Sequence, residues 1–482
     1  MKISISFPPL ESEKGTPLLT QNRQFQWFSS PTYIYPVVPA TAATLLKKNG
    51  FDVFWDDGIA EELSYKEWEN RILKENPDLL LIESKTPVIK KHWKIINKIK
   101  NQKSKIKIIL VGDHVTALPK ESFRNSKVDY VLTGGDYDFL LLNLVNHLEG
   151  GKDLEPGVWY REKDEIKNTG PFQLNHNLNE LPFIDRNLTK WKLYAYKNGN
   201  FSRTPGTYIM SGRDCFWHKC TFCSWTTLYP NFQVRTPENV LDEIGELIEK
   251  YKVKEIMDDA GSITPGEWIR DFCGGMIKRG YNKKVKIDCN ARFKSLPQND
   301  YNLMAKAGFR LLLFGLESAN QKTLDRVNKG IKVKDIIEGC KMAKKAGLSP
   351  HITTMTGYPW ETKEEAQKTI DLAKELFRKG WVDTLQATII IPYPGTPLYK
   401  YCKENNLLLT KNWDDFDMRK PVMKTEMSTA EIKELTRDLY TAFASPKFIM
   451  RKILGIRNFD DVKYIFRAGV KVISHLADFR KG

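Results

Sequence analysis

Three of the seven cysteines lie within nine residues, at Cys215, Cys220 and Cys223, with four residues and then two between them. A short loop with this spacing can turn three sulfur atoms toward one point, as thiolate ligation of zinc or of an iron–sulfur cluster requires. Three protein thiolates leave one iron of a four-iron cluster open to a further ligand. This open position favours a reactive centre over a structural one.

Two other interpretations of the cysteine loop stay open at this point. His218 can complete a zinc site, although it lies inside the first interval, where the geometry is cramped. The three cysteines can also be unrelated buried side chains. Because closed zinc sites use four protein ligands, the loop alone favours iron–sulfur.

The composition indicates a globular protein of two or three domains, because 482 residues exceed what one core usually holds. The sequence contains no run of about 18 apolar residues, so no transmembrane helix is expected. An odd number of cysteines suits a reducing cytoplasm, and no signal peptide is expected before the strand that begins at Ile3. The net charge of +16 comes from lysines interspersed with glutamates; without a basic and aromatic stripe, no nucleic-acid partner is expected.

Residues 1–150 alternate between strand and helix patterns, which predicts a doubly wound parallel sheet. We expect strands at 3–7, 52–55, 79–83, 106–111 and 130–132, and helices at 39–49, 65–75 and 90–100. Sheets of this kind bind ligands at the carboxyl ends of their strands. The candidate ligand-binding residues in those loops are Asp57, Gly58, Ser84, Thr86, Gly112, Asp113, His114, Gly134 and Gly135.

The rest of the chain divides into three stretches. Prolines and glycines break the pattern in residues 151–200, which we interpret as a linker. Alternation resumes in residues 201–400 and predicts a partial (β/α) barrel, with the cysteine loop after its first strand at 207–210, at the carboxyl face. Residues 401–482 form a helical C-terminal region, in which Ser428 to Glu431 is a capping box.

Charged side chains follow two of the expected barrel strands. Asp258 and Asp259 end one strand and can accept hydrogen bonds from an ammonium group, or they can cap the next helix. Arg292 ends the next strand and can hold a carboxylate with two parallel hydrogen bonds, or form a surface salt bridge. On the helix at 237–251, Glu243 is expected on the solvent-exposed face. The remaining cysteines, Cys273, Cys289, Cys340 and Cys402, are expected to be buried and structural.

The cysteine loop and three later phrases resemble the radical S-adenosylmethionine (radical SAM) enzymes. The phrases are Gly315-Leu316-Glu317-Ser318, the turn from Gly357 to Thr362 and the turn from Pro392 to Tyr399. The usual first cysteine interval is one residue shorter, so we expect a bulge that pushes Trp217 or His218 outward. The resemblance implies a [4Fe-4S] cluster on the three cysteines, and an S-adenosylmethionine site formed by Phe222, Asp258, Asp259, Arg292, Glu317, Ser318, Gly357 and Pro392.

The N-terminal domain resembles the cobalamin-binding domain that precedes many radical SAM barrels. It lacks the Asp-x-His-x-x-Gly motif, which implies cobalamin bound without a protein histidine on the cobalt. His114 is therefore expected to orient its loop or to be solvated. The alternative is a sheet that binds nothing and only supports the barrel.

The resemblance implies an enzyme that cleaves S-adenosylmethionine to a 5′-deoxyadenosyl radical, with cobalamin carrying a methyl group to an unactivated carbon. The first alternative is a cobalamin-dependent cyclase, a carbon–carbon bond-forming enzyme or a rearranging enzyme acting on a lipid or tetrapyrrole-like substrate. The second is a non-catalytic iron–sulfur or zinc binding protein. The implied partners are a small-molecule or lipid substrate and an electron donor such as ferredoxin or flavodoxin.

The C-terminal region mixes basic and apolar residues at helical spacing in 446–454 and 464–473. Such helices can pack on the barrel, which we favour, or lie on an anionic membrane surface. The protein is thus expected to be cytoplasmic, with peripheral membrane contact as the second interpretation.

Overall fold

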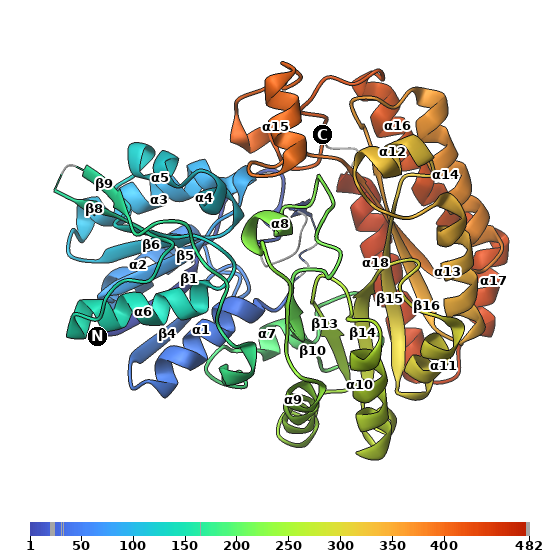
Figure 1. The fold of residues 1–482 in the computed structure, drawn as a ribbon, viewed down its shortest axis with the longest axis horizontal. Coiled ribbons are helices and arrows are strands. Elements are labelled where there is room, and N and C mark those ends of the chain that lie inside the picture. The colour runs from blue at the N-terminus through green and yellow to red at the C-terminus, as the bar shows by residue number, and fades with distance from the viewer. Residues whose placement is uncertain (20–24, 30, 32, 164, 479–482) are drawn as a thin grey trace.

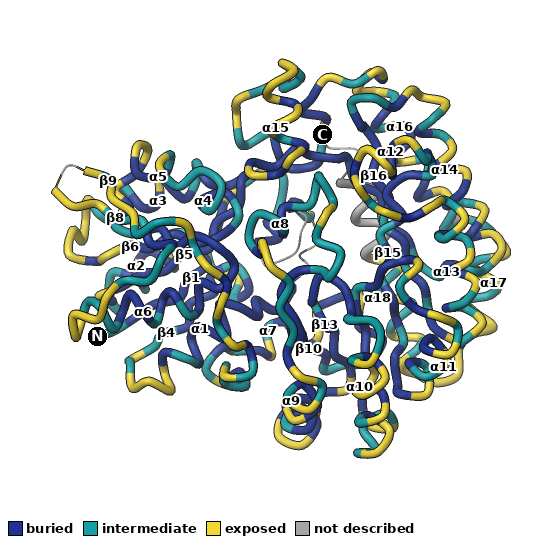
Figure 2. The backbone as a smooth tube through the Cα atoms, in the orientation of Figure 1, coloured by how far each residue is buried: buried dark blue, intermediate teal, exposed yellow. Residues whose placement is uncertain are grey.

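The computed structural model describes residues 1–19, 25–29, 31, 33–163 and 165–478. Its two large sheets lie side by side, each with its own helices (Figure 1). In Figure 2 the buried backbone runs through both sheets, and exposed backbone is concentrated at helix ends and connecting turns. The predicted α/β class, with an N-terminal parallel sheet and a C-terminal partial barrel, is confirmed.

The first sheet has seven strands in the order β4-β1-β5-β6-β7-β8-β9, and the first five of these are parallel. β5 is buried along its whole length, as expected of a parallel strand covered on both faces. The parallel strands are β1 (Lys2–Phe7), β4 (Asp52–Asp57), β5 (Leu79–Glu83), β6 (Lys107–Val111) and β7 (Tyr130–Leu132). The helices are α1 (Val37–Lys48), α2 (Tyr65–Glu75), α3 (Ile89–Gln102), α4 (Asp113–Ala117), α5 (Pro119–Asn125) and α6 (Tyr137–Gly150), with η1 (Thr86–Val88), and β2 (Thr16–Pro17) pairs with β3 (Trp27–Phe28).

The first sheet continues into the stretch that the sequence marked as a linker. β8 (Val158–Glu162) and β9 (Glu165–Asn168) form an antiparallel hairpin that pairs with β7. The interpretation of residues 151–200 as a linker is therefore wrong for this hairpin. Only η2 (Leu178–Glu180) and α7 (Lys192–Ala195) follow before the barrel within the described residues.

The second sheet has six parallel strands in chain order, which is the topology of a partial barrel. The strands are β10 (Gly206–Ile209), β13 (Glu255–Asp258), β14 (Lys286–Ala291), β15 (Phe309–Glu317), β16 (Ser349–Thr356) and β17 (Thr384–Ile389). The connecting helices are α9 (Pro237–Glu249), α10 (Glu267–Lys278), η3 (Tyr281–Lys283), α11 (Gln298–Lys306), α12 (Gln321–Arg326), α13 (Val333–Lys345) and α14 (Lys363–Arg378). Between β10 and α9, the short strands β11 (Gly212–Arg213) and β12 (Gln233–Val234) pair on either side of the cysteines and of α8 (Trp225–Leu228).

The C-terminal region is helical, as predicted. Its elements are α15 (Pro397–Glu404), η4 (Trp413–Asp415), α16 (Thr429–Tyr440), η5 (Thr441–Ala444), α17 (Pro446–Leu454) and α18 (Phe459–Asp478). The capping box at Ser428 and Glu431 is present, and α16 packs on β17 and α14. Residues 479–482, and the side chains of residues 471–473 in the predicted basic and apolar segment, lie outside the described residues. Within that described part of the chain, no helix is long and apolar enough to cross a membrane.

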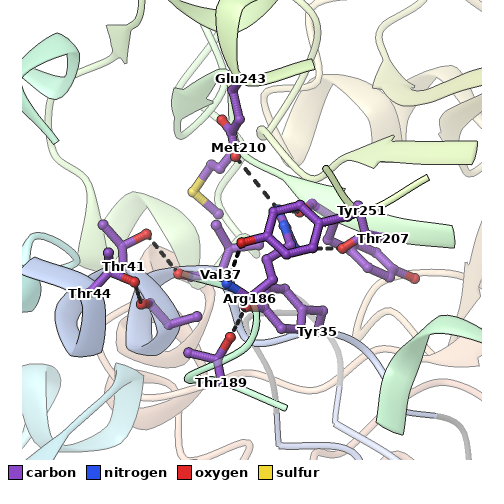
Figure 3. A network of polar contacts seen from close by, with 12 residues as sticks. Tyr35, Val37, Thr41, Thr44, Arg186, Thr189, Thr207, Met210, Glu243 and Tyr251 are labelled. Atoms are coloured by element: carbon purple, nitrogen blue, oxygen red, sulfur yellow. Dashed lines mark hydrogen bonds and ion pairs between the residues drawn. The ribbon is translucent and has the colours of Figure 1, made fainter. Parts of the chain in front are cut away.

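A buried arginine fastens the stretch before the barrel to the barrel itself (Figure 3). The guanidinium of Arg186 donates to Thr207 Oγ1 (2.5 Å) and to the Tyr208 carbonyl (2.8 Å), and lies 3.6 Å from Glu243 Oε1. Glu243 also accepts from Arg235 at 2.6 Å. Glu243 is thus buried between two cations, and its predicted place on a solvent-exposed helix face is wrong.

Candidate active site

A cavity of about 220 Å³ lies at the carboxyl ends of the barrel strands. The three cysteines all line it, although they come from the loop after β10 and not from the sheet. Four of the residues predicted for S-adenosylmethionine also line it: Phe222, Asp259, Arg292 and Glu317. As expected of parallel strands, three separate strand ends meet the cysteine loop at one cavity.

The cysteine loop absorbs its extra residue through left-handed backbone at Asp214 and His218, with φ of +67° and +52°. The His218 ring forms a hydrogen bond with the Asp214 carboxylate. The Trp217 ring lies under the guanidinium of Arg292, 4.2 Å from centroid to Cζ, and its Nε1 donates to the Asn328 carbonyl at 2.7 Å. Trp217 and His218 both line the cavity, so the expectation that one would be pushed outward is wrong.

The start of the loop is anchored by a buried arginine. Arg213 donates to Asp136 (2.6 Å) and Asp138 (2.5 Å), both from the loop and helix that follow β7 in the first domain. Ser211 donates to Asp258 through its backbone N–H and its hydroxyl, at 2.9 and 2.5 Å. Both domains thus fix the approach to the first cysteine.

A cation pair lies beside the sulfur atoms. Lys329 Nζ is 2.7 Å from Glu317 Oε1, and Arg292 donates to the backbone carbonyl of Lys329. Burial raises the pKa of the Cys220 thiol, while the charges of Lys329 and Arg292 act in the opposite direction. These cations favour bound anionic sulfur. Lys329 was missed as a site residue, although the phrase Asn328-Lys329-Gly330 was a signal for it.

An irregularity in the backbone of β15 accompanies the contact between Glu317 and Lys329. Glu317 has a φ of +64°, and the register of β15 on β16 shifts between Gly315 and Glu317. A Cβ at Gly315 would lie 2.0 Å from Glu317 Oε1 and 2.6 Å from Lys329 Nζ. Glycine at 315 therefore leaves the room in which the two charged groups meet.

The other residues predicted for S-adenosylmethionine do not line the cavity. The Asp258 carboxylate instead accepts hydrogen bonds from Ser211, as described above. The hydroxyl of Ser318 donates to Glu361 Oε1 at 2.6 Å and is buried. Gly357 and Pro392 lie outside the lining, although the residues that flank Pro392 belong to it.

The donor set fits an iron–sulfur cluster better than a single zinc ion. Among the described residues, no three His, Cys, Asp or Glu side chains converge closely enough for one metal ion. Thiolates on one zinc lie about 3.8 Å apart, given Zn–S bonds of about 2.3 Å and tetrahedral angles. His218, the fourth ligand in the zinc interpretation, is hydrogen-bonded to Asp214 instead.

The glycines at the strand ends of the first domain pack against the protein's own atoms. A Cβ at Gly112, whose φ is +117°, would lie 2.2 Å from the Ser84 carbonyl oxygen, and one at Gly135 would lie 1.8 Å from the Tyr229 ring. Close approach also explains the remaining two predicted glycines, Gly58 beside Pro9 and Gly134 beside Phe172. Close packing within the protein therefore accounts for these glycines, and they do not indicate space for a bulky ligand.

The predicted polar residues of these loops mostly have partners. His114 is fully buried, and its ring nitrogens lie 3.2 Å from Thr86 Oγ1 and 3.1 Å from Glu121 Oε2. His114 thus orients its loop and is not solvated. Ser84 lies 2.7 Å from the His92 ring. Asp57 accepts from Tyr194 and from the Ala60 N–H, and burial raises the pKa of Asp57 to about 6.

A second, smaller cavity of about 20 Å³ separates these loops from the cysteine loop. Glu83, Lys85, Gly112 and Asp113 line it from the first sheet, and α8 closes it from the other side. Ser224, the residue after the last clustered cysteine, lines both cavities. The two candidate sites are therefore neighbours.

Comparison with known proteins agrees with this arrangement. Residues 210–373 match the radical SAM superfamily. The chain is 29% identical to a protein of Pyrococcus horikoshii described as an uncharacterized methyltransferase, over 95% of this chain and 96% of that protein. It is 25% identical to the anaerobic magnesium-protoporphyrin IX monomethyl ester cyclase of Cereibacter sphaeroides, over 81% of this chain and 64% of the cyclase.

Two solved structures share the whole fold. The cobalamin-dependent radical enzyme OxsB, with aqua-cobalamin and S-adenosylmethionine bound, superposes with a TM-score of 0.70 at 14% identity, over 98% of this chain and 71% of that one. The radical S-adenosylmethionine methyltransferase TsrM of Kitasatospora setae, with cobalamin and a [4Fe-4S] cluster bound, gives 0.69 at 12% identity, over 99% of both chains. The barrel thus matches the radical SAM superfamily over residues 210–373, and the chain as a whole has the fold of these two solved radical S-adenosylmethionine enzymes.

Proposed function

We propose that the protein is a cobalamin-dependent radical SAM methyltransferase that methylates an unactivated carbon of a small molecule or lipid. The carrying observation is the position of Ser224, which places the cysteine cavity directly beside the strand ends of the first domain. The two solved structures hold cobalamin in the same overall fold.

The residues of the cavity have distinct roles in this proposal. Cys215, Cys220 and Cys223 hold the cluster; cluster and S-adenosylmethionine supply a carbon-centred radical when bound, and cobalamin supplies the methyl group. Arg292 has a buried Nη1 without a hydrogen-bond partner among the described residues, which fits a ligand carboxylate. Glu317, held by Lys329, can accept from an amino or hydroxyl group of the ligand.

Apolar side chains form part of the cavity wall. Phe222, Met355 and Tyr393 line the cavity together with strand-end backbone. Such side chains would limit the access of water to a radical formed in the cavity.

The test of the function is anaerobic purification with a supply of hydroxocobalamin, followed by iron, sulfide and corrinoid analysis. We expect about four irons and about one corrinoid per chain, since three thiolates and one further ligand complete a four-iron cluster. With a reductant such as reduced flavodoxin, the protein should form 5′-deoxyadenosine and S-adenosylhomocysteine. Formation of neither product would contradict the proposal.

The similarity to the Cereibacter sphaeroides cyclase favours ring formation as a second candidate function. A cyclase would consume S-adenosylmethionine and give 5′-deoxyadenosine without S-adenosylhomocysteine. It would also leave the substrate without the mass of one methyl group. Product analysis by mass spectrometry therefore separates the two candidates.

We also propose that the C-terminal helices α17 and α18 contact an anionic membrane surface. Nine large apolar side chains are exposed between residues 449 and 470, including Leu454 at 77% and Phe466 at 73%. The basic residues Lys447, Arg457 and Lys463 are exposed in the same segment. In such a segment the basic side chains can contact anionic lipid headgroups, while the apolar side chains enter the layer of acyl chains below them.

Vesicle co-sedimentation tests the membrane proposal. The wild-type protein should bind vesicles that contain phosphatidylglycerol and not vesicles of phosphatidylcholine alone. The double variant Leu454→Ser and Phe466→Ser should lose binding, whereas Leu409→Ser, which changes another exposed leucine (55%), should not. Equal sedimentation of all three proteins would refute the contact.

A further inference from the structure

The cysteine loop reaches the protein surface at Trp217 and Lys219. Trp217 follows the first clustered cysteine by two residues and is half-buried. Its ring lies under the Arg292 guanidinium, and it packs so closely on the backbone that a Cβ at Gly330 would lie 2.1 Å from it. Lys219 is exposed, and its Nζ lies 5.2 Å from the centre of the same ring. The loop that carries the three sulfur atoms is therefore accessible from outside at these two residues.

Two helices hold this loop from either side. The N–H of Thr221 donates to the carbonyl of Val327, the residue after α12, at 3.0 Å, and the Thr221 carbonyl accepts from the Leu398 N–H in α15 at 2.9 Å. Figure 1 shows α12 and α15 at the top of the barrel. The Trp217 indole is held from the same turn, by the Asn328 carbonyl. The surface of α12 thus adjoins the surface of the cysteine loop.

The surface that α12 adds is basic. Between residues 322 and 334 five basic residues stand against one acidic residue, Asp325. Lys322 and Arg326 are four residues apart on α12, so they lie on one face of the helix, and both are exposed. Neither of them forms an ion pair with another described residue, and the same holds for Lys219. The positive charge beside the cysteine loop is therefore open to a partner.

We propose that the basic surface formed by Lys219, Lys322 and Arg326 docks an acidic electron-transfer protein of the flavodoxin type. This inference rests on the proposed function, because it requires a cluster on the three cysteines that accepts an electron. Flavodoxins are strongly acidic proteins, so the two surfaces are complementary in charge. In the docked complex one electron passes from the donor to the cluster; the donor is oxidised by one electron, and no bond forms or breaks.

A nucleic acid is the other acidic macromolecule that such charge would attract. Proteins that bind single-stranded nucleic acids add aromatic rings on which the bases stack. Here the Trp217 ring already packs against Arg292 and Gly330, where a base would have to lie. The connection of this ring to the cysteine loop also gives an electron donor a reason to dock at this place. Both observations favour a redox protein.

The test compares the double variant Lys322→Glu and Arg326→Glu with Lys66→Glu and Lys94→Glu as a matched control. Lys66 and Lys94 are exposed on α2 and α3 of the first domain and form no ion pair with another described residue. Isothermal titration calorimetry of each reconstituted holoenzyme, at about 20 mM salt to limit screening, gives the dissociation constant for oxidised flavodoxin. Stopped-flow absorbance gives the rate of cluster reduction by reduced flavodoxin and by the deazaflavin radical, a small reductant that needs no docking surface.

We expect the α12 variant to bind flavodoxin about tenfold more weakly and to be reduced by it about tenfold more slowly, because two attractive charges become repulsive. The control should stay within about twofold of the wild type, since its charges lie on the other domain. All three proteins should react equally with the deazaflavin radical. Raising the salt to about 300 mM should slow the wild type and remove most of its advantage over the α12 variant.

The possible failures are distinguishable. A wild-type protein that holds no reducible cluster would overturn the proposed function and this inference together. Equal flavodoxin binding and reduction in all three proteins would overturn this inference alone, and so would a wild-type reduction rate that does not fall as salt rises. Weaker binding of a fluorescent RNA oligonucleotide by the α12 variant, with unchanged reduction by flavodoxin, would assign the surface to nucleic acid instead. If the α12 variant loses its iron, Lys322→Gln and Arg326→Gln takes its place in the same comparison.

Discussion

Replacing Arg213 by methionine should destabilise the protein strongly. Arg213 is 3% exposed, and its two partners, Asp136 and Asp138, are 2% and 0% exposed. Removing one member of a buried ion pair leaves an uncompensated charge and costs about 3–5 kcal/mol. Here one cation serves two carboxylates, so we expect a loss of about 3–5 kcal/mol in the free energy of unfolding at pH 7.

The loss should depend on pH. In the wild type, burial works against ionisation of Asp136, but Arg213 lowers the pKa of this carboxyl below its ordinary value of 3.8. A carboxylate with a lowered pKa adds stability above pH 4 and loses it as the pH falls. In the variant burial acts without the cation, so the pKa in the folded state rises above that of the unfolded chain. The deficit should therefore be largest at neutral pH and shrink toward pH 4 to 5.

Urea unfolding at pH 5, 6 and 7, followed by tryptophan fluorescence, measures this loss. The control is Arg270→Met, because Arg270 is 55% exposed and water screens its pair with Asp300, so this variant should lose much less stability than Arg213→Met. Iron content after reconstitution should also fall in Arg213→Met, since Cys215 follows the anchored strand. A loss below about 1 kcal/mol at pH 7, or one that is constant from pH 5 to 7, would refute the reasoning.

Three further substitutions test other parts of the structure. Gly315→Ala places a Cβ between Glu317 and Lys329 and should weaken S-adenosylmethionine binding by about tenfold in isothermal titration calorimetry, with the melting temperature nearly unchanged because flexible side-chain ends can move aside; unchanged affinity would contradict the role given to that pair. His218→Gly should retain the cluster, whereas His218→Val should lose about 1–2 kcal/mol of stability, because a β-branched residue is strained at a φ of +52°. The raised pKa of Asp57, about 6 against 3.8, means that the folded state binds more protons than the unfolded chain, so this group should lower stability by about 2 kcal/mol as the pH rises from 4 to 6. Asp57→Asn should remove that part of the decline, and identical pH profiles for the two proteins would count against it.

The strand ends were predictable from the sequence because parallel strands bring their carboxyl ends to one edge. Arg292 and Glu317 therefore meet the cysteine loop, as expected. Asp258 and Asp259 could not be separated in this way, since neighbouring strand residues point to opposite faces and the pattern does not say which face holds the ligand. Asp258 turns to Ser211, and Asp259 lines the cavity.

Other features depend on contacts between distant segments. Lys329 comes from the turn after α12, and only the folded chain shows that it meets Glu317. A glycine in the sequence does not show which group packs against it. At Gly135 of the first domain that group is the ring of Tyr229, which follows the cysteine loop. The hairpin of β8 and β9 was not predicted because both strands are short and the edge strand β9 is largely polar, as edge strands often are.

The short helix α8 begins two residues after the last clustered cysteine, and it forms a wall of the cavity at the strand ends of the first domain. Oxygen that destroyed the cluster would free Cys223 and loosen that wall at the same time. We therefore expect air exposure to release the corrinoid along with the iron. After desalting, loss of the corrinoid absorbance from the protein fraction would then report cluster damage.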